Sequence, residues 1–433
     1  MLKAEPKQVC YAAPPELTRK TGGSIRVLAV FFHPSTSVTA IGGAEKRFVE
    51  TLKLLCENDA FKFCILESSP SLLANSEMKC FRRLVSLRLS GVGWLGNYFC
   101  WVLWALKTVV DGLELAKKAK PQIIFVPNNT FPNLFAGSVL GLILRRQLCV
   151  VVHHIDLPSL NVGGKGACSL YGCYRSVGYS RAVALIKAVA FHVTIILLRR
   201  ANAIIAVSSF TAESLRRSGV LKAEIFVSGN AVDAKLIENV KLSKDAKDIK
   251  IYDAAFVGRI SKEKGIFDLL EAWKKVVEVK SDAKLLIVGS GLELEPLKEA
   301  VALCGLDKNV FVRGRCADVE LFQLLKQSKV FVFPSLFEGW GISVAEALAC
   351  GLPVVAYDIP ALREVFGKCK SVFLVPVKDI DGLASRILKV LGKNAQECES
   401  LSLASKSYVA RFSWEKVASR DSEILRLLCA VRH

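Results

Sequence analysis

Two acidic residues in the second half of the chain have a spacing that suits one elongated polar ligand. Glu338 follows a short apolar run, and Glu346 comes eight residues later in a helical pattern. Eight helical residues rise about 12 Å and rotate by about 800°, so the two carboxylates can contact different parts of one molecule. Carboxylates are strong acceptors for the hydroxyl groups of a sugar or a ribose. A glycine-rich turn with Glu346 in solvent would give the same spacing.

Two basic residues follow an earlier apolar run and suit an anion. Arg259 and Lys264 come after Gly258 and are five residues apart, so they can converge on one ligand from a loop. An arginine fork and a lysine point charge can stabilise the negative charge that develops when a bond to a nucleoside diphosphate breaks, without a metal ion. The alternative is a solvated loop with ordinary ion pairs.

Glycines precede two helical patterns. Gly339 and Gly341 leave the backbone uncovered before one helix, and Gly42 and Gly43 do so before another. Uncovered amides at a helix N-terminus can approach a phosphate or a sugar. A glycine pair alone is also typical of an ordinary turn.

Adjacent histidines end a further apolar run. His153 and His154 follow Val152, and the carboxyl end of a parallel strand faces the ligand crevice. Neighbouring side chains on a strand point to opposite faces, which disfavours a shared metal ion. We therefore expect one of the two to face a ligand, whereas a lone histidine elsewhere would more often be a core residue.

The positive charge is unevenly distributed. The 433 residues carry a formal net charge of +19; residues 1–200 hold 25 Lys and Arg against 11 Asp and Glu, and residues 201–433 hold 34 against 29. A basic first half suits phosphate-bearing substrates, anionic lipid or nucleic acid, although surface lysines also simply maintain solubility. We find no helix-turn-helix, zinc-finger or aromatic-rich RNA motif, which disfavours nucleic acid. The composition excludes intrinsic disorder.

Three apolar segments raise the question of a membrane. Residues 1–24 contain charges and prolines but no apolar run, so we expect no signal peptide. The three later segments each fall short of about 20 consecutive apolar residues. They are residues 89–106, 121–144 and 182–198. The first holds three tryptophans between Arg88 and Lys107, a pattern typical of a helix in the headgroup layer and equally of a buried core helix. The tryptophans are Trp94, Trp101 and Trp104.

Short apolar runs alternate with helical patterns, which predicts parallel sheets covered by helices on both faces. We predict strands at Ile25–Phe32, Ile123–Val126, Cys149–His153, Ala203–Val207, Ile225–Ser228, Ala254–Val257, Lys284–Val288, Val310–Val312, Val330–Phe333, Pro353–Ala356 and Ser371–Leu374. The polar stretch Asp233–Lys250 divides two such series. The fold class is therefore α/β, with two Rossmann-like, doubly wound parallel-sheet domains that face each other across a cleft.

Five segments, in order, resemble the retaining glycosyltransferases of family 4. The run Pro334–Gly341, followed by Glu346 and Cys350–Val355, is similar to the donor-binding signature of that family. The other four segments are Gly42–Glu45, Ser228–Asp233, Val257–Gly265 and Ile287–Gly291. Phe412–Glu415 also resembles the signature of the last helix of the family.

The resemblance implies a GT-B fold and a retaining hexosyltransferase. It implies an N-terminal extension (1–24), an acceptor domain (25–228), a donor domain (229–412) and a C-terminal helix (413–433) that crosses back to the first domain. The donor would be a UDP-, GDP- or ADP-sugar, which is a substrate, so neither a cofactor nor a metal is expected. The basic first half and the tryptophan-rich segment, rather than the resemblance, favour an acceptor that is lipid-linked or a polysaccharide.

The resemblance also implies roles for individual residues. Arg259 and Lys264 would stabilise the leaving diphosphate, Glu338 would position the sugar, and Glu346 would hold the ribose. His154 would stabilise an oxocarbenium-like transition state or orient the sugar. The expected donor-binding residues are Gly42, Gly43, Gly258, Arg259, Lys264, Gly289, Glu338, Gly339, Trp340, Gly341, Ile342 and Glu346, with His153 and Asn230 as further candidates.

Two positions depart from the family pattern. Ala231 stands where the family usually has glycine, which would stiffen the hinge between the domains, and the paired glycine usual before Glu364 is absent. Neither change removes a group that the chemistry needs.

The same observations predict where the protein acts and leave two other functions open. We expect a cytoplasmic protein with peripheral contact to anionic lipid on the inner face of the cell membrane. A non-catalytic protein that binds nucleotide sugars or polysaccharide is the first alternative, and a basic nucleic-acid-binding protein is the second.

Overall fold

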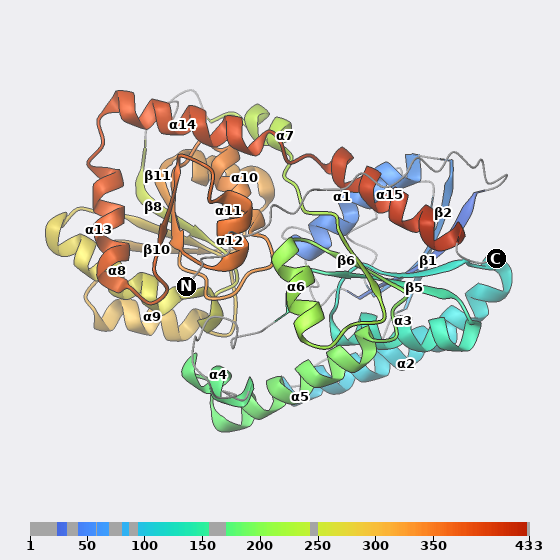
Figure 1. Cartoon of the computed structure of the whole chain (residues 1–433). Helices are drawn as coiled ribbons and strands as arrows, with labels where there is room; N and C mark the ends of the chain where they lie inside the picture. The colour runs from blue at the N-terminus through green and yellow to red at the C-terminus, as the bar shows by residue number, and fades with distance from the viewer. Residues whose placement is uncertain are drawn as a thin grey trace, which may run out of the picture.

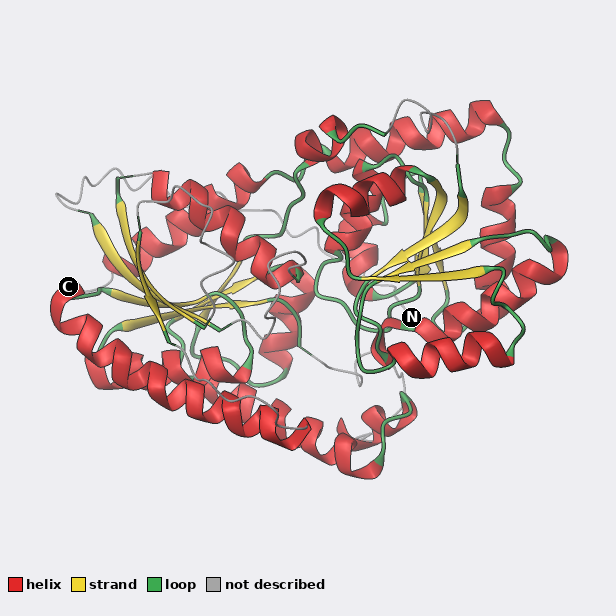
Figure 2. Ribbon diagram, turned by 180° about the vertical axis from the view of Figure 1, so that it is seen from behind, coloured by secondary structure: helices red, strands yellow, loops and turns green. Residues whose placement is uncertain are grey.

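The computed structural model contains two α/β domains that lie side by side (Figure 1). In each domain, helices cover both faces of a parallel sheet (Figure 2). The structure describes residues 24–32, 42–57, 59–68, 80–85, 94–155, 170–242 and 250–430. The predicted fold class, two Rossmann-like parallel-sheet domains, is confirmed.

The first domain is built on a seven-stranded sheet with the order β3-β2-β1-β4-β5-β6-β7, and all its strand pairs are parallel. The strands are β1 (Ile25–Phe31), β2 (Phe61–Glu67), β3 (Phe81–Leu84), β4 (Ile123–Val126), β5 (Gln147–Val152), β6 (Ala203–Ala206) and β7 (Glu224–Val227). The strand order reverses between β1 and β4, and ligands bind at the carboxyl ends of the strands beside such a reversal.

Alternate residues of β1 enter the two cores of this domain, because successive side chains on a strand point to opposite faces. Leu28 and Val30 pack with residues of α2, α3 and α5, whereas Val27 and Ala29 pack with residues of α1 and α15. The helices of this domain are α1 (Gly43–Glu57), α2 (Trp94–Ala119), α3 (Phe131–Leu144), α4 (Leu170–Ser176), α5 (Arg181–Leu198), α6 (Ser209–Arg217) and, from the end of the chain, α15 (Trp414–Ala430).

The second domain is built on a six-stranded parallel sheet with the order β10-β9-β8-β11-β12-β13. Its strands are β8 (Tyr252–Val257), β9 (Leu285–Val288), β10 (Val310–Gly314), β11 (Ser328–Phe333), β12 (Val354–Tyr357) and β13 (Val372–Val375). Its helices are α7 (Ala234–Asn239), η3 (Lys262–Lys264), α8 (Ile266–Val279), α9 (Leu294–Leu303), α10 (Asp318–Lys326), α11 (Ile342–Ala349), α12 (Pro360–Phe366), α13 (Ile380–Leu391) and α14 (Ala395–Val409). Here the strand order reverses between β8 and β11.

Helix α15 returns from the second domain to the first and packs on α1 (Figure 1). A buried ion pair joins the two helices, with Arg47 Nη2 2.9 Å from Oδ1 of Asp421. Arg47 also donates to the Ser228 hydroxyl at 3.1 Å and to the Gly229 carbonyl oxygen at 3.3 Å. The Ser228 hydroxyl in turn donates to Oδ1 of Asp421 at 2.6 Å, so α1 and α15 together hold the chain segment between the two sheets.

The tryptophan-rich segment lies partly in the core. Trp104 is buried and donates its indole N–H to the Val85 carbonyl oxygen at 3.0 Å, and its ring packs on Phe32. Trp101 is half-buried against the same Phe32 ring. The side chain of Trp94 lies outside the described residues. Of the two readings of this segment, the core reading holds for Trp104.

Candidate active site

Two loops meet at the reversal of strand order in the second sheet. The basic loop, Gly258–Gly265, follows β8, and the acidic loop, Pro334–Gly341, follows β11. Gly265 has a φ of +65°, and a Cβ atom on it would overlap the Pro334 carbonyl oxygen. The two backbones are in contact, because the Leu336 amide also donates to the Glu263 carbonyl oxygen at 2.9 Å. Residues predicted from separate parts of the sequence are thus brought together.

The lysine and the first glutamate form an ion pair between these loops. Lys264 donates from Nζ to Oε1 of Glu338, and both side chains are largely buried, with 16% and 13% exposed. The ammonium also lies 5.8 Å from the centre of the Phe333 ring. A cation and a carboxylate in this arrangement can bind an anion and a hydroxyl group of the same ligand.

Arg259 points more toward solvent than Lys264 does. Its side chain is 60% exposed, and Nη1 lies 3.9 Å from Oε1 of Glu263, a long and screened contact. Little free energy is needed to move the guanidinium from Glu263 onto an incoming anion.

Glu263 receives a hydrogen bond from the other domain. Tyr179, in the turn between α4 and α5, donates its hydroxyl to Oε2 of Glu263. Burial raises the pKa of Glu263, but the bonds from Tyr179 and from its own backbone, together with the charge of Arg259, lower it by more. The net result is a pKa below the ordinary value and a charged carboxylate beside the basic loop.

Glu346 is paired with a lysine of the other domain. Lys46 of α1 donates from Nζ to Oε1 of Glu346 at 2.7 Å and to Oδ2 of Asp318 at 3.0 Å. Lys46 and Glu346 are both buried. Burial lowers the pKa of Lys46, but the two carboxylates raise it by more, so its net pKa lies above the ordinary value. This charged, buried lysine joins the two domains.

The histidine pair lies against the acidic loop. A Cβ atom on Gly339 would overlap the His153 carbonyl oxygen and lie 3.1 Å from Cβ of His154. Only glycine fits at such an approach of two backbones. The end of β5 and the acidic loop therefore meet at position 339.

The two histidines differ in their surroundings. Nε2 of His153 lies 3.1 Å from the Pro127 carbonyl oxygen, which can only accept, so this nitrogen carries the proton. Burial and the charge of Arg47 lower the pKa of His153 to about 3. The side chain of His154 is exposed, and its carbonyl oxygen accepts from Asn129 at 3.1 Å.

The glycine turn before α1 lies beside α11. A Cβ atom on Gly43 would lie 2.8 Å from Cδ1 of Ile342, the first residue of α11. Gly341 caps that helix with a φ of +102°. Gly43, Gly341 and Ile342 are thus neighbours, and Gly42 precedes them in an exposed position.

The remaining predicted residues, Trp340, Gly289 and Asn230, contact other groups of the protein. The Trp340 ring is buried against Phe366 and Phe412, with ring centres 5.3 and 5.0 Å apart. The ring of Trp340 therefore packs in the core of the second domain. Gly289, with a φ of +149°, approaches Gly258 so closely that a Cβ atom would overlap its carbonyl oxygen. Asn230 is buried, and its side-chain oxygen accepts from the Ala231 amide at 3.3 Å.

The sequence matches two family models that together span most of the chain. Residues 41–236 match Glycosyltransferase Family 4, and residues 239–407 match Glycosyl transferases group 1. The chain belongs to the family 4 glycosyltransferases of the GT-B fold.

Curated relatives of the family match part of the chain. An uncharacterized glycosyltransferase of Methanocaldococcus jannaschii is 30% identical over 172 residues, 40% of this chain and 44% of the relative. The phosphatidyl-myo-inositol mannosyltransferase of Mycolicibacterium smegmatis is 33% identical over 167 residues, 38% of this chain and 42% of the relative. In both comparisons the match spans less than half the length of the relative.

A solved structure of the GT-B fold matches nearly the whole chain. HepE of Anabaena, in complex with UDP and glucose, superposes with a TM-score of 0.68 over 92% of this chain and 99% of that chain. Its sequence is 19% identical. At this identity the likeness shows the fold.

Three residues at this family 4 site were not predicted from the sequence: Lys46, Tyr179 and Glu263. Each acts across the two domains or between the two loops, so its partner is far away in the sequence. Two of them have neighbours that were predicted, since Lys46 follows the glycine turn and Glu263 lies between Arg259 and Lys264. Tyr179 has no such sequence signal.

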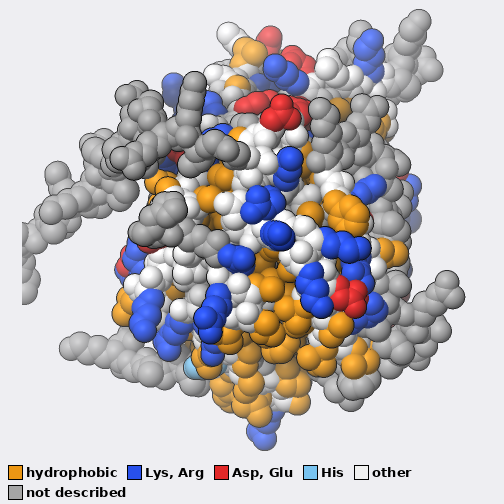
Figure 3. Space-filling view, turned by 90° about the vertical axis from the view of Figure 1, so that its right-hand side faces the viewer, with side chains coloured by type: hydrophobic (Ala, Val, Ile, Leu, Met, Phe, Trp, Pro, Cys, Tyr) orange, Lys and Arg blue, Asp and Glu red, His pale blue; other side chains and the backbone are white. Residues whose placement is uncertain are grey.

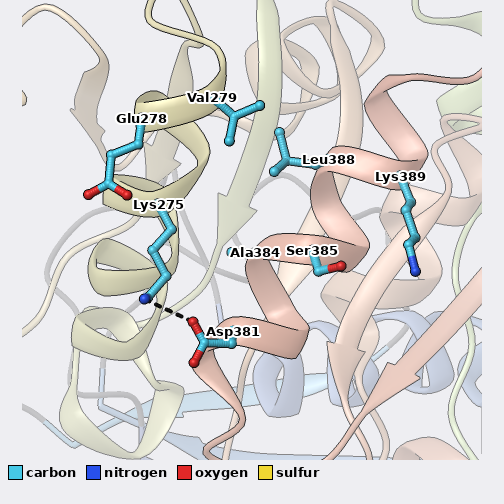
Figure 4. A pocket seen from close by; sticks show the side chains of 8 residues that line it. All are labelled: Lys275, Glu278, Val279, Asp381, Ala384, Ser385, Leu388 and Lys389. Carbon is cyan, nitrogen blue, oxygen red and sulfur yellow. Dashed lines mark ion pairs between the residues drawn. The ribbon is translucent and has the colours of Figure 1, made fainter.

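A surface hollow of about 570 Å³ lies elsewhere, between α8 and α13 (Figure 4). An ion pair between Lys275 and Asp381, 2.8 Å apart, crosses one side of it. Its lining includes none of the predicted site residues. We assign the chemistry to the two loops, where charged groups converge, rather than to this hollow. Among the described residues, no group of three or more His, Cys, Asp or Glu is arranged to hold a metal ion.

Proposed function

We propose that the protein transfers a sugar from a nucleoside diphosphate donor, a UDP-, GDP- or ADP-sugar, to an acceptor with retention of the anomeric configuration. The observation that carries this proposal is the ion pair between Lys264 and Glu338 at the reversal of strand order. Arg259 lies on the same loop as Lys264, and Glu346 lies in the helix that follows Glu338. This arrangement offers cations for a diphosphate and carboxylates for a sugar and a ribose.

The leaving group is the diphosphate. As the bond between the anomeric carbon and the phosphate oxygen breaks, its electron pair passes to that oxygen, and the charges of Arg259 and Lys264 stabilise it. Two cations in a partly buried site do this without a metal ion, so the reaction needs no cofactor. The acceptor hydroxyl attacks the face from which the diphosphate departs and gives its proton to the departing phosphate oxygen, so that the new bond retains the configuration.

The carboxylates orient the donor. Glu338, held by Lys264, accepts from hydroxyl groups of the sugar, and we assign the amides of residues 339–342 to the positioning of the same sugar. Lys46 bonds Oε1 of Glu346, and we assign Oε2 to the ribose hydroxyls. His154 lies beside the acidic loop and stabilises the positive charge that develops on the sugar ring, and His153 and Asn230 support the surrounding turns.

The acceptor is a lipid-linked molecule or a polysaccharide. The net charge of +14 in residues 1–200 supports an acceptor at an anionic surface. We place the protein in the cytoplasm, in peripheral contact with the inner face of the cell membrane. The mannosyltransferase relative, by its name, acts on phosphatidyl-myo-inositol, and the structural neighbour binds UDP and glucose. The first is consistent with a lipid acceptor, and the second with a nucleotide-sugar donor.

The test combines binding and turnover. A thermal-shift screen of UDP-, GDP- and ADP-sugars identifies the donor, because a ligand that binds the folded state raises the melting temperature. Transfer or hydrolysis of that donor is then measured for the wild type, Lys264→Ala and Glu338→Ala, with Lys275→Ala, in the surface hollow, as the control.

We expect loss of turnover in the first two variants and wild-type turnover in the control, with and without a chelator. A donor that binds without turnover in the wild type would instead indicate the non-catalytic binding protein. Binding of DNA or RNA with no response to any nucleotide sugar would overturn the proposal.

A further inference from the structure

We propose that the outer face of α5 docks on an anionic lipid bilayer, and that this docking reaches the basic loop through Tyr179. The docking is inferred from the surface of the first domain alone. The second part rests on the proposed function, because it concerns the binding of the donor.

The outer face of α5 is an apolar stripe. The helix has 18 residues and a mean hydropathy of 2.0, and by length and composition it is the one helix among the described residues that could cross a membrane. Its inner face is anchored in the domain by four buried residues, and its outer face exposes four large apolar ones. The buried residues are Ala184, Ala188, Ile195 and Leu198, and the exposed residues are Leu185, Ile186, Val189 and Ile196.

The spacing of the exposed residues explains why they form one face. Positions three, four and seven apart lie above one another on a helix, and residues 185, 189 and 196 follow this pattern. Three of the four side chains are more than half exposed. A helix that is anchored on one side and apolar on the other lies in the plane of an interface rather than across it.

The neighbouring helix extends this face. Helix α3 packs beside α5 and exposes Leu142 and Ile143 at its end. In the space-filling view, apolar side chains gather along the lower edge of the molecule, with Lys and Arg side chains above them (Figure 3). A continuous exposed apolar surface of this kind marks an interaction site rather than an ordinary solvated surface.

The charges around the face indicate what covers it. Arginines lie near both ends of α5 and follow α3, whereas residues 131–146 and 170–200 contain no Asp or Glu. The arginines are Arg145, Arg146, Arg175, Arg181, Arg199 and Arg200. A second copy of this face would bring the same positive charges together and be repelled. An anionic bilayer offers apolar tails for the stripe and negative headgroups for its rim.

The N-terminal end of α5, together with the turn that precedes it, contacts the basic loop. The turn between α4 and α5 extends toward the second domain (Figures 1 and 2). There Tyr179 donates to Oε2 of Glu263, and Nζ of Lys262 donates to the Gly178 carbonyl oxygen at 2.8 Å. Nζ of Lys187, a residue of α5, lies 4.9 Å from the centre of the Tyr179 ring. The position of α5 therefore sets the position of Tyr179.

The contact with Glu263 affects how readily Arg259 meets a diphosphate. Glu263 bonds Tyr179 through one oxygen and attracts Arg259 through the other. A firm bond from Tyr179 satisfies part of the carboxylate and weakens its hold on Arg259, which then binds the diphosphate more readily. When α5 is fixed on a bilayer, Tyr179 is held on Glu263, and the affinity for the donor rises.

Co-sedimentation tests the docking without any turnover. The full chain is mixed with vesicles of phosphatidylglycerol and phosphatidylcholine, or of phosphatidylcholine alone. We expect sedimentation with the anionic vesicles only, weakened by salt above about 0.1 M, and lost in Val189→Glu. The matched control is Leu303→Glu, at an exposed apolar position of α9 in the second domain, which should sediment like the wild type.

Three results would overturn the docking. The first is that Val189→Glu sediments as the wild type does, and the second is that the wild type does not sediment with the vesicles. The third is that light scattering shows a dimer of the wild type and a monomer of Val189→Glu. The last would assign the face to a second copy of the chain.

The KM for the donor tests the coupling. Anionic vesicles should lower the KM of the wild type about tenfold, the low end of the effect of one hydrogen bond to a charged group. In Tyr179→Phe the KM should be higher and should not respond to vesicles, although this variant still sediments. An equal response in both proteins would overturn the coupling and leave the docking. If no nucleoside diphosphate sugar binds the wild type, the proposed function fails and the coupling with it, whereas sedimentation still decides the docking.

Discussion

Replacing Lys46 with methionine should open the two domains. Lys46 is the buried cation that joins α1 to Glu346 and Asp318, at 2.7 and 3.0 Å. Methionine keeps most of the length of the side chain and removes its charge. Two carboxylates of the second domain then face an apolar side chain of the first, and the buried one, Glu346, regains solvation only when the domains separate.

The magnitude follows from the burial of the pair. Removing one partner of a buried ion pair costs about 3–5 kcal/mol. Glu346 is 8% exposed but Asp318 is 39% exposed, so solvent already screens the second contact and the lower figure applies. About 3 kcal/mol shifts an equilibrium between closed and open domains by roughly a hundredfold.

Small-angle scattering and donor titration measure this shift. We expect Lys46→Met to have a larger radius of gyration and at least tenfold weaker donor binding. The control is Lys53→Met on the same helix, because Lys53 forms a surface pair with Glu50 at 2.8 Å that is worth well under about 1 kcal/mol. A Lys46→Met protein that is as compact as the control and binds donor equally well would refute this reasoning.

Three further predictions concern other parts of the site. Gly339→Ala should lower kcat/KM at least about a hundredfold in a transfer assay, because the added Cβ atom has no room beside His153. The control is Gly141→Ala, whose Cβ atom would lie 3.5 Å from Cβ of Leu148, its nearest neighbour; this variant should retain activity. The pKa of His153 is about 3 in the folded protein and 6.5 ordinarily. Between these pH values the unfolded chain binds more protons than the folded one, so the stability of the fold falls as the pH drops from 6.5 toward 3. In melting curves over this range, the melting temperature of His153→Gln should fall less than that of the wild type. Glu364→Ala should lower the melting temperature by about 2–4 °C, because Glu364 accepts from the Ser209 and Phe210 amides at 2.7 Å and so caps α6; an unchanged value would show that the cap contributes nothing.

The eleven strands expected from the sequence all occur in the structure, with ends that shift by up to two residues. Apolar runs such as Ile123–Val126 were readable because strands of a covered parallel sheet are buried on both faces. Strands β2 and β3 were not predicted from the sequence. Strand β3 is a mostly exposed edge strand that contains Arg82 and Arg83, and hydrophobicity cannot reveal a strand whose side chains remain in solvent.

The site was predictable where it depends on local spacing. Lys264 and Glu338 each follow a strand, and their meeting follows from the strand order of a doubly wound sheet. Contacts between domains were not predictable in this way. Lys46 and Glu346 are 300 residues apart, and their ion pair exists only because of how the domains are placed. The same holds for Tyr179 and Glu263.

In the proposed site, the cations of the basic loop and the carboxylate of Glu346 hold two ends of one molecule. Calorimetric titration of the nucleoside diphosphate selected by the donor screen, and of its free nucleoside, tests this directly. Lys264→Ala should weaken binding of the diphosphate at least about tenfold and leave the nucleoside unchanged, whereas Glu346→Gln should weaken both. Wild-type affinity of Lys264→Ala for the diphosphate, or an effect of Glu346→Gln on neither ligand, would contradict the account.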